Sequence, residues 1–177
     1  FFSVASVYQL PFGKGQRWLQ SGPISRVLGN WQLNAILLGR SGQPFTPFTN
    51  LDIANIGATT ASSRVRPNLL RSPQLANPTP SAWFDRTAYA APAQYTYGTA
   101  GRNQLRADRL DNLDFALFRE DRWTERLRSQ LRLELFNALK HASFGTPQLL
   151  LSSPAFSQVS GTSSGARQMQ LALKLLF

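Results

Sequence analysis

The sequence predicts an all-β fold made of antiparallel strands of a transmembrane β-barrel, about five of them, with two long loops on one side. Two observations carry this prediction. Several stretches alternate apolar and polar residues with a period of two, as strands with two different surroundings do. The connections between these stretches are short and long in turn, an asymmetry that is typical of membrane barrels.

Residues 167–177 give the clearest strand signal. The apolar positions on one face are Met169, Leu171, Leu173, Leu175 and Phe177. Gln168, Gln170 and Lys174 fall on the opposite face. A tilted strand needs about 9–11 residues to cross a bilayer, so this segment is long enough to span one.

Four further strands are predicted over residues 2–10, 31–40, 113–119 and 127–136. The stretch 127–136 is ambiguous, because Leu127, Leu131 and Leu135 also recur at the spacing of an amphipathic helix. Leu, Arg and Glu favour a helix as well. A strand is more consistent with the neighbouring segments, and it is the structure that we expect.

The connections cover residues 11–30, 46–109, 120–126 and 141–166. If the chain ends on the periplasmic side, both long connections are extracellular and both shorter ones are periplasmic, as in known barrels. Five strands cannot close, since the smallest such barrels have about eight. Unpaired strand edges in lipid would cost several kcal/mol per backbone group, an order-of-magnitude figure. We therefore expect residues 1–177 to be a fragment, with more strands upstream.

The chain carries a net charge of +10, from 19 basic and 9 acidic residues, and it has no cysteine. The lack of cysteine excludes disulfides and thiolate metal sites. The basic excess makes nucleic acid a candidate partner, but no recognition motif supports it, so we expect none. Charged lumen and loop residues explain the excess, and outer-membrane lipid and lipopolysaccharide are the expected surroundings.

Catalysis is not expected, and neither is a cofactor or a metal site. Residues 161–165 match the nucleophile-elbow pattern, but that pattern requires a helix after it and a later histidine. A strand is expected there instead, and the only histidine, His141, comes earlier. A single histidine does not make a histidine cluster for a metal ion.

The connection over residues 46–109 is the best candidate for ligand contact, because loops on a rigid scaffold carry function. Its candidate contact residues are Trp83, Phe84, Tyr89, Tyr95, Tyr97 and Arg102. The alternative is that these side chains pack the loop onto itself.

An ordered set of short motifs points to a family. Residues 7–15, 29–33, 41–45, 66–69, 83–85, 101–103 and 134–137, together with the terminal Phe177, resemble the C-terminal region of Oar-like TonB-dependent outer-membrane receptors. The resemblance covers nearly the whole chain.

The resemblance implies a barrel of about 22 strands around a plug domain, located in the bacterial outer membrane. Residues 1–177 would be the C-terminal part of the barrel, without the plug. It implies uptake of a bulky, unidentified nutrient, energised by TonB through the missing N-terminal plug region. It also implies that the outer-membrane assembly machinery binds the strand of Met169 to Phe177, and pairing with an exposed strand gives that role a mechanism. An adhesion or surface-interaction barrel without transport is the alternative.

Overall fold

The computed structural model describes residues 1–49, 52–57 and 65–177. The chain divides into two units. The sheet unit consists of Phe1–Arg40, Asp111–His141 and Gly165–Phe177, and the loop unit consists of Ser41–Leu110 and Ala142–Ser164. Residues 50–51 and 58–64 of the expected connection 46–109 lie outside the described residues.

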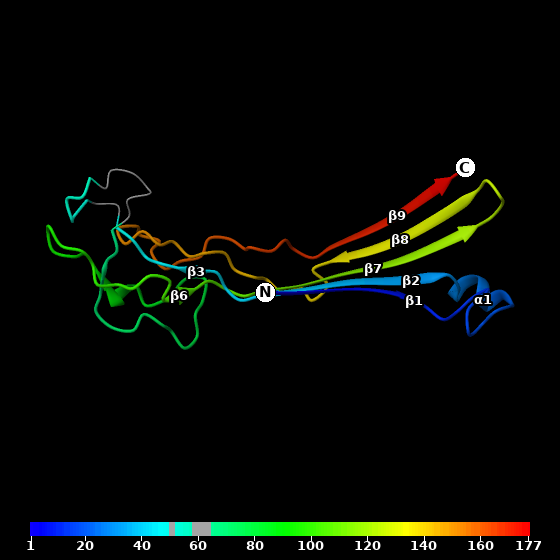
Figure 1. Cartoon of the computed structure of the whole chain (residues 1–177), viewed down its shortest axis with the longest axis horizontal. Helices are drawn as coiled ribbons and strands as arrows, with labels where there is room; N and C mark the ends of the chain where they lie inside the picture. Colours follow the sequence, from blue (N-terminus) through cyan, green and yellow to red (C-terminus); the bar gives the residue numbers. More distant parts are fainter. Residues whose placement is uncertain (50–51, 58–64) are drawn as a thin grey trace. The chain divides into compact units, whose positions relative to one another are not determined.

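Five long strands form the sheet unit, in the spatial order β1-β2-β7-β8-β9 (Figure 1). Neighbouring strands follow one another along the sheet in chain order. The strands are β1 (Phe2–Gln9), β2 (Trp31–Arg40), β7 (Leu110–Arg122), β8 (Arg128–Phe136) and β9 (Gln168–Leu176). The predicted all-β fold and all five predicted strands are confirmed. The sheet is open, with β1 and β9 at its edges.

The register between strands separates an apolar face from a polar face. Leu117 of β7 pairs with Leu133 of β8, which pairs with Leu171 of β9. One position along, Ala116 pairs with Glu134, which pairs with Gln170. Because side chains on paired residues point to the same side of a sheet, the predicted alternation becomes two continuous surfaces.

The ambiguous stretch 127–136 is a strand. All nine residues of β8 pair with β9, from Arg128 opposite Leu176 to Phe136 opposite Gln168. A helix here would leave two neighbouring strands without hydrogen-bond partners, so pairing outweighs the helical propensity of Leu, Arg and Glu.

Strand β7 is longer than the sequence predicted, and the turn after it is shorter. The expected strand ended at residue 119 and the expected turn covered 120–126, because three charged residues suggested a turn. These residues continue the ladder instead: Glu120 pairs with Gln130, and Arg122 pairs with Arg128. The strand also begins earlier than the predicted residue 113, at Leu110, so Asp111 lies within it.

The connection 11–30 contains a helical turn that was not predicted, α1 (Pro23–Leu28). Pro23 stands at its start, where the missing N–H costs no hydrogen bond, and Gly29 follows its end and donates its N–H to the Ser25 oxygen at 2.9 Å. Six residues are too few for a clear helical period, so sequence patterning missed it. No helix in the described part of the chain is long and apolar enough to cross a membrane.

Gly39 of β2 provides space for an aromatic ring. It pairs with Phe2 of β1, and a Cβ atom at Gly39 would collide with the Phe2 ring. The ring therefore covers the glycine across the strands, which compensates for the packing that a glycine lacks.

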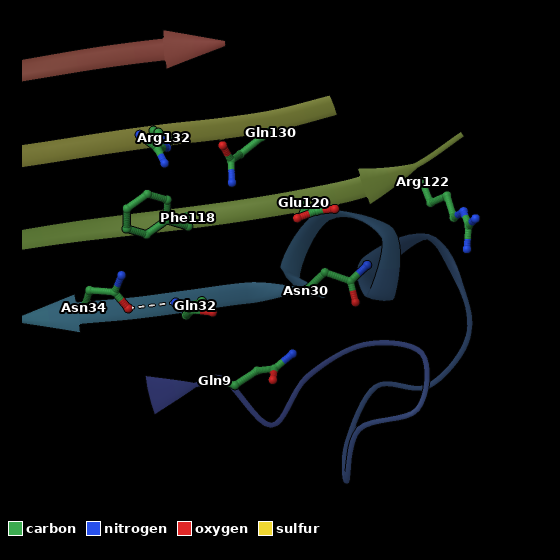
Figure 2. Close-up of a pocket in the computed structure, with 9 residues that line it drawn as sticks. All are labelled: Gln9, Asn30, Gln32, Asn34, Phe118, Glu120, Arg122, Gln130 and Arg132. Carbon is green, nitrogen blue, oxygen red and sulfur yellow. Dashed lines mark hydrogen bonds between the residues drawn. The ribbon is translucent and has the colours of Figure 1, made fainter. Parts of the chain in front are cut away.

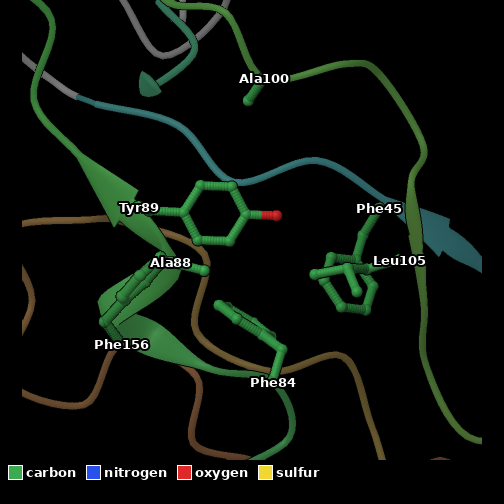
Figure 3. Packing of buried hydrophobic residues seen from close by; sticks show 7 residues of the cluster. All are labelled: Phe45, Phe84, Ala88, Tyr89, Ala100, Leu105 and Phe156. Carbon is green, nitrogen blue, oxygen red and sulfur yellow. The ribbon is translucent and has the colours of Figure 1, made fainter. Parts of the chain in front are cut away.

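The loop unit is built by both long connections around an aromatic core (Figure 3). Phe84 is its centre, with a ring centroid 5.1 Å from Phe156, 5.8 Å from Tyr89 and 5.8 Å from Phe45. Phe156 belongs to the second connection and the other three to the first. Ala88, Ala100 and Leu105 complete the buried cluster.

Short elements and backbone bonds hold the loop unit together. Its pairs of two-residue strands are β3 (Pro44–Phe45) with β6 (Leu105–Arg106), and β4 (Asn68–Leu69) with β5 (Tyr89–Ala90). The 3₁₀ turn η1 (Arg86–Ala88) precedes β5. The two connections also bind each other directly: Phe48 N–H donates to the Leu149 oxygen at 3.0 Å, and Trp83 N–H to the Ser157 oxygen at 2.8 Å.

Asp85 caps η1 and fixes its entry. Its carboxylate accepts hydrogen bonds from the Thr87 hydroxyl at 2.6 Å and the Thr87 N–H at 2.9 Å, and it pairs with Arg71 at 2.8 Å. The bonds from Thr87, followed by Arg71, hold the pKa of the Asp85 carboxyl below its usual range.

We expect Phe84→Ala to destabilise the loop unit by about 3–5 kcal/mol, because it removes the ring on which three other aromatic rings pack. Limited proteolysis of the folded protein measures this as faster cleavage within residues 41–110. Tyr95→Ala is the matched control, since the Tyr95 side chain is 71% exposed. Equal cleavage of Phe84→Ala and wild type would contradict the assignment of Phe84 to the core.

Burial raises the pKa of Tyr89 to about 12, from 10.0. A raised pKa favours the neutral phenol in the folded state, so the stability that Tyr89 contributes is complete below pH 10 and is lost as the pH rises from 10 towards 12. Absorbance of the phenolate should show a titration step near pH 12 that disappears in Tyr89→Phe. If the step near pH 12 were unchanged in Tyr89→Phe, the phenol with the raised pKa would not be Tyr89.

Candidate functional site

The loop unit contains a cavity of about 660 Å³, which falls in the size range of small-molecule pockets. Trp83 and Leu75 supply apolar wall, while Gln74 and Gln104 supply amide groups. The remaining lining residues are Ser41, Gly42, Pro78, Leu105, Arg106, Ala107, Asp108 and Arg109.

Trp83 is held from two sides. Its indole N–H donates to the Arg106 oxygen at 2.9 Å, and its ring meets the Phe144 ring edge-on at a centroid distance of 6.1 Å. A ring fixed in this way offers a rigid flat surface, which loses little entropy when a ligand packs on it. Aromatic side chains with a polar handle are common anchors in binding sites.

Residues 104–109, which form another part of the lining, are fixed by polar contacts. The Arg106 guanidinium donates to the Gly42 oxygen at 3.0 Å, and Ala107 N–H donates to the Gln43 oxygen at 3.0 Å. Asp108 accepts from Phe144 N–H at 3.0 Å. The cavity is therefore largely preformed, and it suits a ligand with an apolar or ring face and polar edges.

The structure separates the expected ligand-contact residues into three groups. Trp83 lines the loop cavity. Phe84 and Tyr89 are 1% and 6% exposed and form the core, so the self-packing alternative describes them. Tyr95, Tyr97 and Arg102 are exposed outside the cavity.

Sequence reasoning missed Gln74, Leu75, Gln104 and Arg106 as lining residues. They come from segments 30 positions apart along the chain, and no spacing motif connects them. The β3–β6 pairing, which brings residue 106 opposite residue 44, places the segment 104–109 beside the lining residues Ser41 and Gly42.

A second cavity, of about 540 Å³, lies on the polar face of the sheet (Figure 2). Its amide and charged side chains come mainly from the neighbouring strands β1, β2, β7 and β8, and Figure 2 shows them beside these strands. Gln32 donates to Asn34 at 2.9 Å, and the Arg132 guanidinium lies 4.9 Å from the centre of the Phe118 ring. The lining residues are Gln9, Asn30, Gln32, Asn34, Phe118, Glu120, Arg122, Gln130 and Arg132.

The residues expected to form the assembly signal lie on the apolar face of β9 and at its end. Leu171, Leu173 and Leu175 follow one another on that face, opposite Leu133, Leu131 and Ser129 of β8. Their exposure is high, as it is for the flanking Met169 and Phe177. No residue of β9 is buried within this chain.

Metal and nucleophile chemistry find no support in the described part of the chain. It contains no group of three acidic, histidine or cysteine side chains that could hold a metal ion. The segment 161–165 leads into β9 and not into a helix, so it lacks the geometry of a nucleophile elbow. His141 is half-buried next to Asn137, whose side chain donates to the His141 oxygen at 3.1 Å.

A family model described as "Outer membrane beta barrel domain" matches residues 1–170. Searches of curated proteins and of solved structures gave no match.

The two faces of the sheet should differ in their access to water. The chain has no cysteine, so single cysteines can be introduced without background. In isolated outer membranes, we expect a water-soluble maleimide to label Gln130→Cys on the polar face and to leave Leu133→Cys, which pairs with Leu117 and Leu171 on the apolar face, unlabelled because lipid covers it. Labelling in the reverse order would show that the faces are assigned the wrong way round.

Proposed function

Since the chain belongs to the family of outer membrane beta barrel domains, we propose that it forms part of the wall and two extracellular loops of a TonB-dependent, Oar-like receptor that takes up a bulky nutrient. The protein is located in the bacterial outer membrane. In this proposal, residues 1–177 are the C-terminal part of the barrel, and the remaining strands and the plug belong to the same polypeptide upstream.

The two faces of the sheet have different surroundings in the barrel. The apolar face, with Leu117, Leu133 and Leu171, contacts lipid, and the polar face lines the lumen. Short connections of such barrels are periplasmic and long ones extracellular. The loop unit, which is built from the two long connections, is therefore extracellular, and α1 and the turn after β7 are periplasmic.

The loop cavity is the observation that carries the uptake function. It offers a fixed indole surface and amide groups in about 660 Å³, on the part of the chain that would meet ligands first. The polar face of the sheet provides further amide and charged groups, which would line the lumen. Capture outside followed by passage through a polar lumen is what a receptor of this kind requires.

Energy supply through TonB rests on the motif resemblance and on the expected plug upstream. No group in the described residues suggests catalysis or a cofactor, and we propose a non-enzymatic role. The strand β9, with its apolar face uncovered within this chain, is the segment that we propose the assembly machinery binds.

Adhesion without transport is the second candidate function. Tyr95 and Tyr97 are 71% and 68% exposed on the loop unit, outside the cavity. Exposed tyrosines are frequent in protein-binding surfaces, and this observation fits an adhesive surface better than an uptake site.

Uptake by living cells decides between the two functions. A strain without the gene is complemented with wild type, Trp83→Ala, Trp83→Phe or Leu70→Ala, and accumulation of labelled oligosaccharides, peptides and iron chelates is measured. We expect one class to require the protein and a protonophore to abolish its uptake. Trp83→Ala should raise the compound concentration that gives half-maximal uptake by about tenfold, as for buried aromatic anchors. Trp83→Phe should raise it by less, because the phenyl ring keeps the packing on Phe144.

Leu70→Ala is the matched control, because Leu70 is 63% exposed in the loop unit and does not line the cavity. Uptake that is unchanged in the deletion strain for every compound class, with loss of surface attachment only, would replace the transport proposal by the adhesion function.

A further inference from the structure

The helical turn α1 has an uncovered apolar face. Ile24, Val27 and Leu28 are spaced i, i+3 and i+4, so they share one side of the turn, and their side chains are 59%, 63% and 48% exposed. No residue of α1 is buried. An exposed apolar face on a protein that spans a membrane is a candidate for contact with lipid.

Arg119 and Trp31 fasten the end of α1 to the lipid-facing side of the sheet. Arg119 pairs with Leu131 and thus points to the apolar face. Its guanidinium donates to the Val27 oxygen at 2.7 Å and to the Arg26 oxygen. The Trp31 indole N–H donates to the same Val27 oxygen at 2.9 Å, and the guanidinium lies 5.7 Å from the Trp31 ring centre.

Arg119 is also paired with a carboxylate of its own strand, Asp121. Its Nε atom forms this ion pair at 2.7 Å, and only 17% of the Arg119 side chain is exposed. A charge on a lipid-facing surface is tolerated near the membrane boundary, where the cost is about 0–1 kcal/mol. The Arg119–Asp121 pair therefore places α1 at the level of the headgroups.

The preceding loop brings a second set of groups to α1. The backbones of Gly13 and Gly29 touch, since a Cβ atom at Gly29 would lie 2.8 Å from the Gly13 Cα. Gly13 N–H donates to the Trp18 oxygen at 3.0 Å, which closes a tight turn containing Lys14. Lys14 and Trp18 are thus held next to the helical turn.

A cavity of about 270 Å³ lies between α1, this turn and the end of β7. Lys14, Arg26 and Arg122 line it, and none of the three forms an ion pair within the described residues. Asp121 also lines it, but its charge is offset by the ion pair with Arg119, which is a lining residue too. Ser25 and Asn30 add polar groups, and Trp123, 67% exposed, forms the rim. The volume lies just below the usual range of about 300–1,000 Å³ for ligand pockets, which suits a single headgroup.

We propose that this cavity binds the phosphate of an anionic phospholipid in the periplasmic leaflet, while Ile24, Val27 and Leu28 enter the boundary of its acyl chains. The unpaired Lys14 and Arg26 complement the phosphate charge, and Arg122, which also lines the cavity on the polar face of the sheet, adds positive charge at the edge of the site. The apolar side of α1 complements the acyl chains of the lipid. Trp18 and Trp123, both more than half exposed, have the interfacial character of the aromatic belts of membrane proteins. The site is independent of nutrient uptake; only the assignment of the leaflet rests on the proposed orientation.

Lipid retention tests the site directly. The purified protein is placed in nanodiscs of phosphatidylcholine that contain a small fraction of phosphatidylglycerol, and the lipids that remain bound after transfer to detergent are identified by mass spectrometry. We expect phosphatidylglycerol to be enriched on the wild type. Lys14→Gln/Arg26→Gln should weaken its retention by about 25-fold, or about fivefold for each charge near the surface.

The matched control is Arg102→Gln/Arg126→Gln, which removes two exposed positive charges outside the cavity. It should retain phosphatidylglycerol as the wild type does. Equal loss in both double variants would show a diffuse charge effect and would overturn the site. Equal retention of the two lipids on the wild type would overturn it without any variant.

Two further measurements separate a lipid site from a phosphate site. Ile24→Ser/Val27→Ser should reduce phosphatidylglycerol retention and leave all three cations in place. Inorganic phosphate at millimolar concentration should not displace the lipid; complete displacement would assign the cavity to free phosphate instead. None of these assays measures transport. Selective retention of phosphatidylglycerol would therefore support the lipid site even if the uptake proposal proved wrong.

Discussion

Every backbone N–H and C=O group that enters the hydrocarbon of a bilayer must find its partner in the protein, since lipid chains offer none. In this chain the sheet meets that demand through neighbouring strands that follow one another in sequence, so each pairing forms between segments joined by one connection. The two-residue period is a consequence: once the ladder is fixed, successive side chains must face lipid and lumen in turn. The charged end of β7 shows that pairing has priority, because Glu120 and Arg122 remain in the ladder despite their polarity.

The same constraint explains where polar groups occur on the apolar face. Arg119 and Asp121 are separated by two positions and therefore point to the same side, where they neutralise each other at 2.7 Å. The remaining guanidinium donors satisfy carbonyl oxygens at the end of α1, where a helix leaves such groups unpaired. Arg119 thus avoids two unfavourable situations: an unpaired charge on the apolar face, and carbonyl oxygens without hydrogen bonds at the end of α1. The helical turn keeps its place although none of its side chains is buried.

The sequence predicted the sheet well because the signal there is local. Alternation from Met169 to Phe177 or from Leu113 to Leu117 is visible within a few residues, and the register preserves it across strands. The ends of β7 were misjudged, since charged residues suit both a turn and a lumen-facing strand.

For the loop unit, the sequence predicted Trp83, Phe84 and Tyr89 as candidate ligand contacts. Composition alone does not distinguish an aromatic ring in the core from one that contacts a ligand. That distinction depends on Phe156, which lies about 70 positions further along the chain and packs on Phe84 and Tyr89. The other cavity residues, such as Gln74 and Gln104, are brought together only by tertiary pairing.

The shared aromatic core of the loop unit also has a consequence for how the loops of this barrel can change in evolution. Where surface loops are independent, selection can replace one of them without regard to its neighbour. Here Phe84 and Phe156 come from different connections and occupy one buried cluster. Either segment transferred alone to another barrel would therefore lack part of its hydrophobic core. The two segments therefore form one structural unit, and neither can be exchanged for a different loop without substitutions in the other that preserve the shared core.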